Sequence, residues 1–200
     1  MKDYRWTVSG PWALGCKETE TEWKMEVEGD VCYVAFKGST SLMDWKQNFS
    51  ILPKLIRPYK SSEFRWYVSS GIFDKFNSVA FDIKKLIDDL KPKRIEVYGF
   101  SQGGAVAKLC CEWLWFNYKD IAIEVHTYNA QKVIWFWNKH KLNNRFEKLN
   151  CHIIRRDIVW RVPFWWLLYL NVGKLIKYGK FGISFPWNWK KTHMSFKEYV

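Results

Sequence analysis

A chain of 200 residues, 48% of them hydrophobic, has the size of one domain, or of two small ones, and can bury a continuous core; we expect a single domain over residues 1–200. Lys and Arg outnumber Asp and Glu by 32 to 20, and the net charge of +12 favours an anionic membrane surface or another acidic partner, the alternative being a basic surface without one. Nucleic acid is not an expected partner, because zinc-finger and RNP motifs are absent and the basic residues are spread along the chain.

The first 20 residues lack the apolar stretch of a secretory signal peptide. The longest apolar run, VPFWWLLYL from Val162, is well short of the roughly 18 to 20 residues that cross a bilayer. We therefore expect a cytoplasmic protein without a transmembrane helix. The cysteines are odd in number and form no CxxC pair, so we expect reduced, buried thiols at Cys16, Cys32, Cys110, Cys111 and Cys151.

The first half of the chain predicts a hairpin, a loop and a long helix. WKMEVEGDVCYVAFKGS is typical of two strands joined by a turn at Gly29 and Asp30, and its second strand is apolar enough to be buried on both faces. Residues 39–60 have no long period and contain two prolines, so we expect a loop with a short helix. An amphipathic helix ending before Lys91 is indicated by the apolar residues Phe76, Val79, Ala80, Ile83, Leu86, Ile87 and Leu90.

The second half alternates strands and helices. RIEVYG predicts a strand, and the apolar residues that follow it recur at helical spacing, with Lys108 and Glu112 on the opposite side of the helix. The next expected elements are a strand at 121–127, a helical segment around 132–146 and a strand at 151–155. This alternation is typical of an α/β protein with a parallel sheet.

GFSQG, residues 99–103, matches the G-x-S-x-G nucleophile elbow, in which a strand turns sharply into a helix and raises the serine hydroxyl above the sheet. Gly99 and Gly103 suit this turn because a Cβ there would collide with the neighbouring strand or helix. The turn also points the backbone N–H of the next residue, Gln102, toward the carbonyl group that reacts. An ordinary glycine-rich turn with a spare serine is the alternative.

A serine hydroxyl becomes nucleophilic only beside a base, and the base needs an acid that orients it. On a sheet of this type the chain order is serine, acid, histidine. Asp157 follows an apolar strand and should lie at its carboxyl end, and His193 is the only histidine after it. The order therefore selects Ser101, Asp157 and His193. The alternatives are a solvated Asp157 paired with Arg155 or Arg156, and a His193 in a frayed C-terminus.

Several segments together resemble the class 3 lipase family of α/β-hydrolases, over nearly the whole chain and in the right order. VCYVAFKGSTSLMDWKQNF is similar to the family's apolar strand with its R-G-[ST] and D-W motifs, and GFSQGGAVAKL to its G-H-S-L-G-G-A elbow. IIRRDIVWRVP resembles its acid motif and HMSFKEYV its closing histidine segment. The resemblance implies an α/β-hydrolase fold, a three-layer α/β/α sandwich with a mostly parallel central sheet.

The resemblance also implies roles for these residues. The serine is the nucleophile, the histidine is the general base and then acid, and the aspartate orients the histidine. The N–H groups of Ser39 and Gln102 are implied to form the oxyanion hole, with Gly38 before it and Asp44 holding the loop, although Asp44 would also suit a helix cap. No metal-ligand spacing or phosphate-binding glycine loop is present, so no cofactor is expected.

The implied reaction is hydrolysis of a lipid ester, either an acylglycerol or a phospholipid, through an acyl-enzyme intermediate. Phe100 and Gln102 replace the family's usual His and Leu, and GFSQGG is closer to carboxylesterases and acyl-protein thioesterases, so a short-chain ester or a thioester is the alternative substrate. The aromatic and basic residues of 159–189 suit an acyl pocket beside an anionic membrane, or else belong to the core. A non-catalytic protein that binds a membrane or a partner through its basic, Trp-rich surface is the second alternative.

Overall fold

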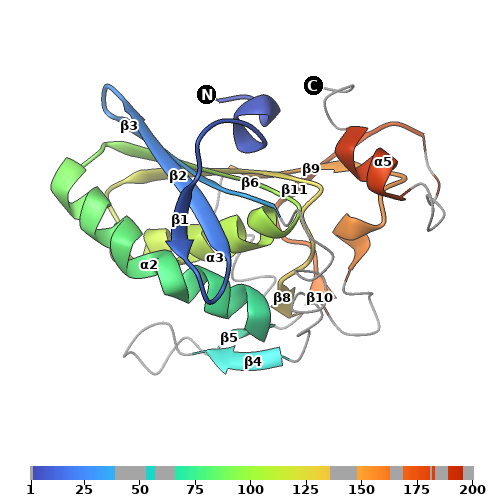
Figure 1. Cartoon of the computed structure of the whole chain (residues 1–200), viewed down its shortest axis with the longest axis horizontal. Coiled ribbons are helices and arrows are strands. Elements are labelled where there is room, and N and C mark those ends of the chain that lie inside the picture. Colours follow the sequence, from blue (N-terminus) through green and yellow to red (C-terminus); the bar gives the residue numbers. More distant parts are fainter. Residues whose placement is uncertain are drawn as a thin grey trace.

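A seven-stranded, mostly parallel sheet forms the centre of the computed structural model (Figure 1). The structure describes residues 2–38, 53–56, 66–135, 148–162, 169–180, 182 and 189–195. In spatial order the sheet consists of β1 (Ala13–Cys16), β2 (Thr21–Glu28), β3 (Val31–Phe36), β6 (Arg94–Phe100), β7 (Ala122–Tyr128), β9 (Leu149–Ile154) and β11 (Lys174–Tyr178). The pairings of β1 with β2 and of β2 with β3 are antiparallel, and all later pairings are parallel.

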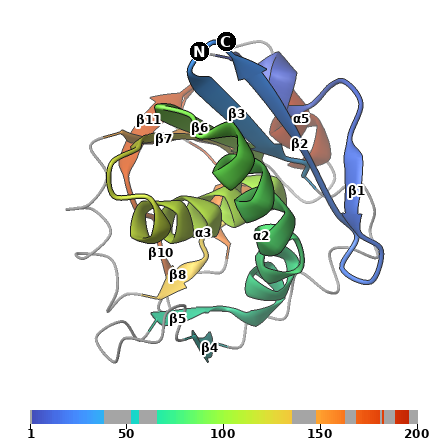
Figure 2. The same cartoon turned by 90° about the vertical axis from the view of Figure 1, so that its left-hand side faces the viewer.

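Helices cover both faces of this sheet (Figure 2). The long helices α2 (Ser70–Leu90) and α3 (Gln102–Asn117) lie on one face and form the main core with the strands. The opposite face is covered by shorter elements, the 3₁₀ helix η1 (Tyr4–Thr7) and the helix α5 (Trp189–Met194). The predicted three layers are therefore present, and the layer that carries α5 is the thin one.

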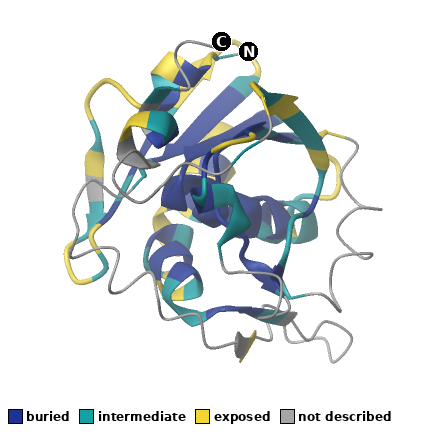
Figure 3. Cartoon of the chain, turned by 90° about the vertical axis from the view of Figure 1, so that its right-hand side faces the viewer, coloured by how far each residue is buried: buried dark blue, intermediate teal, exposed yellow. Residues whose placement is uncertain are grey.

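The strands at the centre of the sheet are buried because both faces are covered. In β3 every residue after Val31 is buried, and β6 is buried from Ile95 to Phe100 (Figure 3). The face of these strands that belongs to the main core is apolar, whereas the opposite face also buries polar side chains, such as Glu96 and Tyr98 of β6. The predicted hairpin of β2 and β3, with its turn at Gly29 and Asp30, is confirmed.

The predicted amphipathic helix is α2, and it begins earlier than expected, at Ser70. It ends at Leu90, because Lys91 adopts a left-handed conformation (φ 47°) and Pro92 cannot continue a helix. Of the predicted apolar face, Phe76, Val79, Ile83 and Ile87 are buried, Ala80 is half-buried, and Leu86 and Leu90 are exposed.

The helix α3 differs from its prediction in burial. Lys108 and Glu112 were expected on an exposed side, yet both side chains are buried. The Lys108 Nζ donates to the carbonyl oxygen of Gln131 at 3.3 Å, and burial lowers the pKa of this lysine. The chain after β7 therefore covers the side of α3 that carries Lys108 and Glu112. This side was expected to face water because both residues are charged.

A second, four-stranded sheet lies beyond the two long helices, on the side away from the central sheet (Figure 2). Its strands are β10 (Tyr169–Leu170), β8 (Ile134–Trp135), β5 (Trp66–Ser69) and β4 (Pro53–Ile56), all paired antiparallel. The expected loop with a short helix is therefore wrong at 53–56, and the expected helical segment around 132–146 is wrong at 134–135. Residues 132 and 133 are not helical either, and the rest of the expected segment, 136–146, lies outside the described residues.

All five cysteines are free thiols in the described ranges. Cys16 is partly exposed, which differs from the prediction, and the buried thiols are Cys32, Cys110, Cys111 and Cys151. Within the helices that the structure describes, none is long and apolar enough to cross a membrane.

Candidate active site

Ser101 lies at the sharp turn between β6 and α3, at the carboxyl edge of the central sheet. Its backbone has φ 55° and ψ −123°, a conformation that costs a non-glycine residue about 1 to 3 kcal/mol. Two backbone hydrogen bonds hold the turn: the Ser101 N–H donates to the Tyr128 carbonyl at 2.9 Å, and the Gly104 N–H donates to the Ser101 carbonyl at 3.1 Å. The strand, turn and helix that the G-x-S-x-G pattern predicts are all present.

Glycines around the serine allow backbone segments to touch. A Cβ on Gly99 would collide with the backbone of Gly103, and a Cβ on Gly103 would collide with the carbonyl oxygen of Phe36 at the end of β3. At Gly38 an added Cβ would lie 2.7 Å from the carbonyl oxygen of Phe100. The end of β3 is therefore packed directly against the turn and the first residues of α3.

Two residues predicted to form or precede the oxyanion hole, Gln102 and Gly38, lie in this closely packed region. Gln102 is buried and is the first residue of α3, so its backbone follows Ser101 directly. Gly38 brings the chain after β3 beside the turn. The other two predicted residues of this region, Ser39 and Asp44, lie outside the described residues.

Asp157 and His193 form a buried pair. The Nδ1 of His193 lies 2.5 Å from Oδ2 of Asp157, and the aspartate is 0% and the histidine 4% exposed. The second carboxylate oxygen, Oδ1, accepts a hydrogen bond from the Val159 N–H at 2.8 Å. Asp157 is therefore not a solvated acid, and His193 does not lie in a frayed terminus.

Two further residues hold His193, and the sequence analysis assigned neither of them this role. The ring of Phe100, next to the serine, packs on the imidazole with ring centroids 4.6 Å apart. Asn129 follows β7; its Nδ2 donates to the His193 carbonyl at 3.4 Å, and its Oδ1 accepts from the Ile154 N–H at 2.7 Å. Asn129 is fully buried and has a positive φ of 45°, which asparagine tolerates better than most residues.

The three predicted residues therefore gather at one edge of the sheet from three separate elements. Ser101 follows β6, Asp157 follows β9, and His193 lies on α5 and packs against the residue before the serine. An imidazole whose Nδ1–H donates to a carboxylate has its other nitrogen, Nε2, available as a base. The arrangement is suited to activating a hydroxyl group for attack on a carbonyl carbon.

Comparisons with known proteins agree with this geometry. The sequence model of the family described as Lipase (class 3) matches residues 33–166, from β3 to beyond Asp157. A comparison with the curated proteins found no match.

Several solved structures share the fold. The Rhizomucor miehei lipase in its propeptide complex superposes with a TM-score of 0.71 at 19% identity, covering 82% of this chain and 54% of that chain. A lipase from Rhizopus microsporus var. chinensis gives 0.70 at 20% identity, with 81% and 58% covered. A triacylglycerol lipase, whose catalytic centre is described as a serine protease triad, gives 0.73 at 18% identity, with 85% and 66% covered.

These likenesses confirm the predicted α/β-hydrolase fold. The chain spans between about half and two thirds of the length of these solved lipases. Because the family model covers more than half of the sequence, from the central strands through the segment that carries Asp157, the chain belongs to the class 3 lipase family.

Proposed function

We propose that the protein is a serine hydrolase that cleaves carboxylic esters of lipids, with Ser101 as nucleophile, His193 as general base and Asp157 as its orienting acid. The observation that carries the proposal is the 2.5 Å contact between His193 Nδ1 and the fully buried carboxylate of Asp157, at the sheet edge where Ser101 turns into α3. Membership of a lipase family supports the same reaction.

The reaction proceeds in two acyl transfers. In the first, His193 takes the Ser101 proton while Oγ attacks the ester carbonyl carbon, and the carbonyl oxygen becomes an oxyanion. His193 then gives the proton to the leaving alcohol as the ester bond breaks, which leaves an acyl-enzyme. In the second transfer, water gives a proton to His193, attacks the acyl carbon and releases the carboxylic acid as the proton returns to Ser101.

Backbone donors stabilise the charge on the oxygen in both transfers. The proposed donors are the N–H groups of Gln102 and Ser39, of which Gln102 lies at the described start of α3. Removing one such donor from an enzyme typically costs about 3 to 4 kcal/mol of transition-state stabilisation. The fixed position of the backbone at the turn supplies this stabilisation without rearrangement during the reaction.

Asp157 contributes through its burial. A carboxylate that is 0% exposed interacts strongly with the positive charge that forms on His193, because little water screens the two groups. Its hydrogen bond from the Val159 N–H fixes the carboxylate plane, so that Oδ2 faces the imidazole. The histidine is thereby held in the tautomer that has its Nδ1 protonated.

A lipid ester, either an acylglycerol or a phospholipid, is the proposed substrate class. The structural similarity to a triacylglycerol lipase supports it, as does the net charge of +12, which favours contact with an anionic membrane surface. Phe100 stands where the family usually has histidine, and its ring contact with His193 shows that this replacement is compatible with a packed imidazole.

The proposal is tested by hydrolysis of p-nitrophenyl esters from acetate to palmitate, with the wild type, Ser101→Ala and Ser9→Ala side by side. Ser9 is an exposed serine outside the turn, so its variant controls for loss of a hydroxyl group. We expect turnover that rises with chain length, disappears in Ser101→Ala and is unchanged in Ser9→Ala. Turnover limited to short chains would favour the esterase or thioesterase alternative.

A fluorophosphonate probe tests the nucleophile independently of the substrate. We expect the probe to add its mass once to the wild-type protein, at the peptide that contains Ser101, and not to Ser101→Ala. A folded wild-type protein that neither reacts with the probe nor hydrolyses any ester would be a non-catalytic member of the family.

A further inference from the structure

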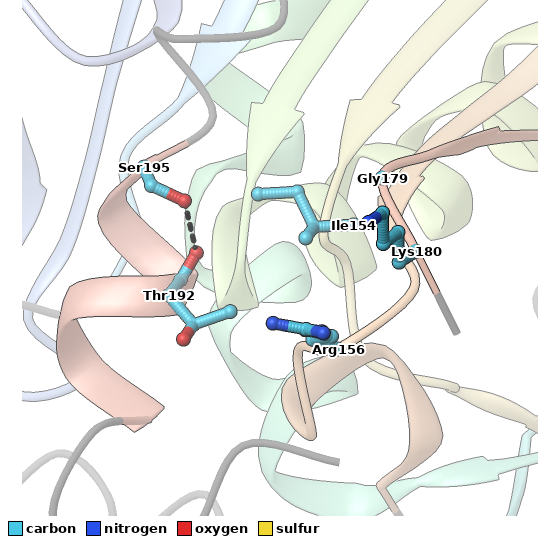
Figure 4. Close-up of a pocket in the computed structure, with 6 residues that line it drawn as sticks. All are labelled: Ile154, Arg156, Gly179, Lys180, Thr192 and Ser195. Atoms are coloured by element: carbon cyan, nitrogen blue, oxygen red, sulfur yellow. Dashed lines mark hydrogen bonds between the residues drawn. The ribbon is translucent and has the colours of Figure 1, made fainter. Parts of the chain in front are cut away.

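A cavity of about 420 Å³ lies between α5 and the chain that follows β9 and β11 (Figure 4). Arg156 directly precedes Asp157 in the chain, and Thr192 directly precedes His193, so two of the lining residues are chain neighbours of the candidate catalytic pair. Its lining residues, within the part of the chain that the structure describes, are Ile154, Arg156, Gly179, Lys180, Thr192 and Ser195.

Two cations line the cavity from separate segments. Arg156 lies in the turn after β9 and its side chain extends toward α5, whereas Lys180 follows β11 (Figure 4). Both residues are exposed to solvent, and neither has an ion-pair partner in the part of the chain that the structure describes. Gly182 lies against the Arg156 side chain, since a Cβ there would be 3.2 Å from Nε.

The described residues of this segment supply no exposed carboxylate that would compensate this positive charge. Asp157 is the only carboxylate in the sequence between residues 148 and 195, and it is buried against His193. Further exposed cations lie nearby in the chain, at Arg155 and Lys191. An anion that enters the cavity therefore meets two cations and no competing exposed carboxylate from this segment.

The described lining is suited to a phosphate group. Among the lining residues that the structure describes, Ile154 is the only apolar side chain, whereas acyl pockets are lined mainly by apolar groups. The arginine fork and the lysine ammonium are the side chains that most often bind phosphate oxygens. The opposite wall carries two hydroxyl-bearing residues, Thr192 on α5 and Ser195 directly after this helix.

We propose that this cavity is a phosphate-binding subsite of the ester-hydrolysing site, with Arg156 and Lys180 as its charged contacts. The proposal rests on the proposed function, because it places a phosphate group next to the pair that cleaves the ester. The phosphate can belong to the headgroup of a phospholipid substrate or to a free phosphate compound, and these two sources are separated by experiment.

The first arm of the test measures binding in the absence of turnover. The melting temperature of the Ser101→Ala protein is measured in inorganic phosphate and in sodium chloride of equal ionic strength, because a ligand that binds only the folded state raises it. We expect phosphate to raise it more than chloride does, and the added double substitution Arg156→Gln/Lys180→Gln to abolish the difference. The control double substitution is Lys174→Gln/Lys177→Gln, which removes the same charge from exposed positions on β11 outside the cavity.

The second arm compares two soluble substrates, dihexanoylphosphatidylglycerol and dihexanoylglycerol, which differ by the phosphate-containing headgroup. In Arg156→Gln/Lys180→Gln the ratio of the phospholipid KM to the dihexanoylglycerol KM should rise about tenfold or more, because charge-assisted contacts are lost. In Lys174→Gln/Lys177→Gln the ratio and the basal activity should stay at the wild-type values.

The two arms distinguish the sources of the phosphate. A change in the KM ratio assigns the cavity to a lipid headgroup, whether or not inorganic phosphate binds. Loss of phosphate binding with an unchanged KM ratio assigns the cavity to a free phosphate compound. If Arg156→Gln/Lys180→Gln alters neither arm relative to the control variant, the proposal is wrong. If the wild type cleaves no ester, the proposed function fails. The melting-temperature arm then still decides whether the cavity binds phosphate.

Discussion

Ser101 combines a reactive position with a strained backbone. Its φ of 55° and ψ of −123° lie in a region that glycine adopts at lower cost than any other residue. The strain persists because the Tyr128 carbonyl and the packing of Gly103 against the end of β3 fix the turn. We therefore expect the strained turn to lower the free energy of unfolding of the protein relative to an unstrained turn.

Replacement of Ser101 separates strain from chemistry. Both Ser101→Ala and Ser101→Gly should lack turnover, but the glycine variant should have a free energy of unfolding about 1 kcal/mol higher than the alanine variant. Urea unfolding of the two proteins measures this difference. At Ser9, where φ is not positive, the order should reverse, with glycine less stable than alanine. A glycine variant at Ser101 that is less stable than the alanine variant, as expected at Ser9, would show that the turn carries no strain.

Asp157→Asn tests the orienting acid. Asparagine can still accept the Val159 N–H, so the fold should be retained, but it favours the wrong imidazole tautomer. We expect kcat for p-nitrophenyl butyrate at pH 7 to fall about 10³- to 10⁴-fold. Asp120→Asn changes an exposed aspartate and should leave kcat unchanged. A near-wild-type rate for Asp157→Asn would mean that another acid orients His193.

At the level of residues, the chain order of serine, acid and histidine was enough to predict the pair that the structure brings together. Asn129 was not assigned a role, because its contact with His193 joins residues 64 positions apart and no motif marks it. Phe100 was noted only as a departure from the family pattern, and its packing on the imidazole depends on where α5 lies.

Among the elements, α5 is a helix of 6 residues that depends on tertiary contacts for its position. Asn129 supplies one of them: its amide joins the end of β9, through the Ile154 N–H, to the His193 carbonyl. The asparagine therefore ties the histidine backbone to the edge of the sheet that carries Ser101 and Asp157.

Asn129→Asp tests this tie. The aspartate keeps the oxygen that accepts from Ile154 but loses the donor to His193, so α5 should loosen. We expect kcat to fall about tenfold, as misplaced catalytic groups commonly cause, and amide exchange in α5 to accelerate. Asn117→Asp is the control, because Asn117 is exposed and its amide also donates to a backbone carbonyl, that of Trp113. Wild-type exchange rates in α5 of Asn129→Asp would contradict the proposed role.

Five strands of the central sheet, β2, β3, β6, β7 and β9, were predicted, whereas β1, β11 and the strands of the second sheet were not. Long apolar strands and α2 leave clear patterns, whereas β8 and β10 have two residues each, too few to show a period. Their pairing is also long-range, because Val68 of β5 pairs with Ile134 of β8. The burial of Lys108 could not be predicted for a similar reason: the covering Gln131 lies in a separate segment.

On the scale of the whole molecule, a row of stacked polar rings crosses the central sheet on the face that the thin layer with η1 and α5 covers. Tyr98 stacks on His126 with centroids 5.1 Å apart, His126 on His152 at 5.8 Å, and His152 on Tyr178 at 6.0 Å. Burial lowers the pKa of His126 and lowers that of His152 to about 4. Both histidines therefore stay neutral in the folded protein at a pH where an unfolded chain would protonate them.

This difference makes stability depend on pH. Between the unfolded pKa of 6.5 and the folded pKa of about 4 for His152, the unfolded state binds more protons, so the free energy of unfolding falls as the pH falls through that range. From pH 6.5 to 5 one such histidine can account for a loss of at most about 2 kcal/mol, and for less where the ring is partly exposed. Urea unfolding at these two pH values should show the loss in the wild type.

His152→Gln isolates the contribution of this ring. Glutamine has no charged form, and it retains a polar group that can reach the Tyr178 hydroxyl, which lies 2.9 Å from His152 Nδ1. The variant should lose less stability than the wild type between pH 6.5 and 5, and His126→Gln/His152→Gln should lose less still, because both rings of the stack then cease to titrate. An equal loss in all three proteins would mean that acid acts on other groups, and that burial of the row of rings does not govern the acid sensitivity of the fold.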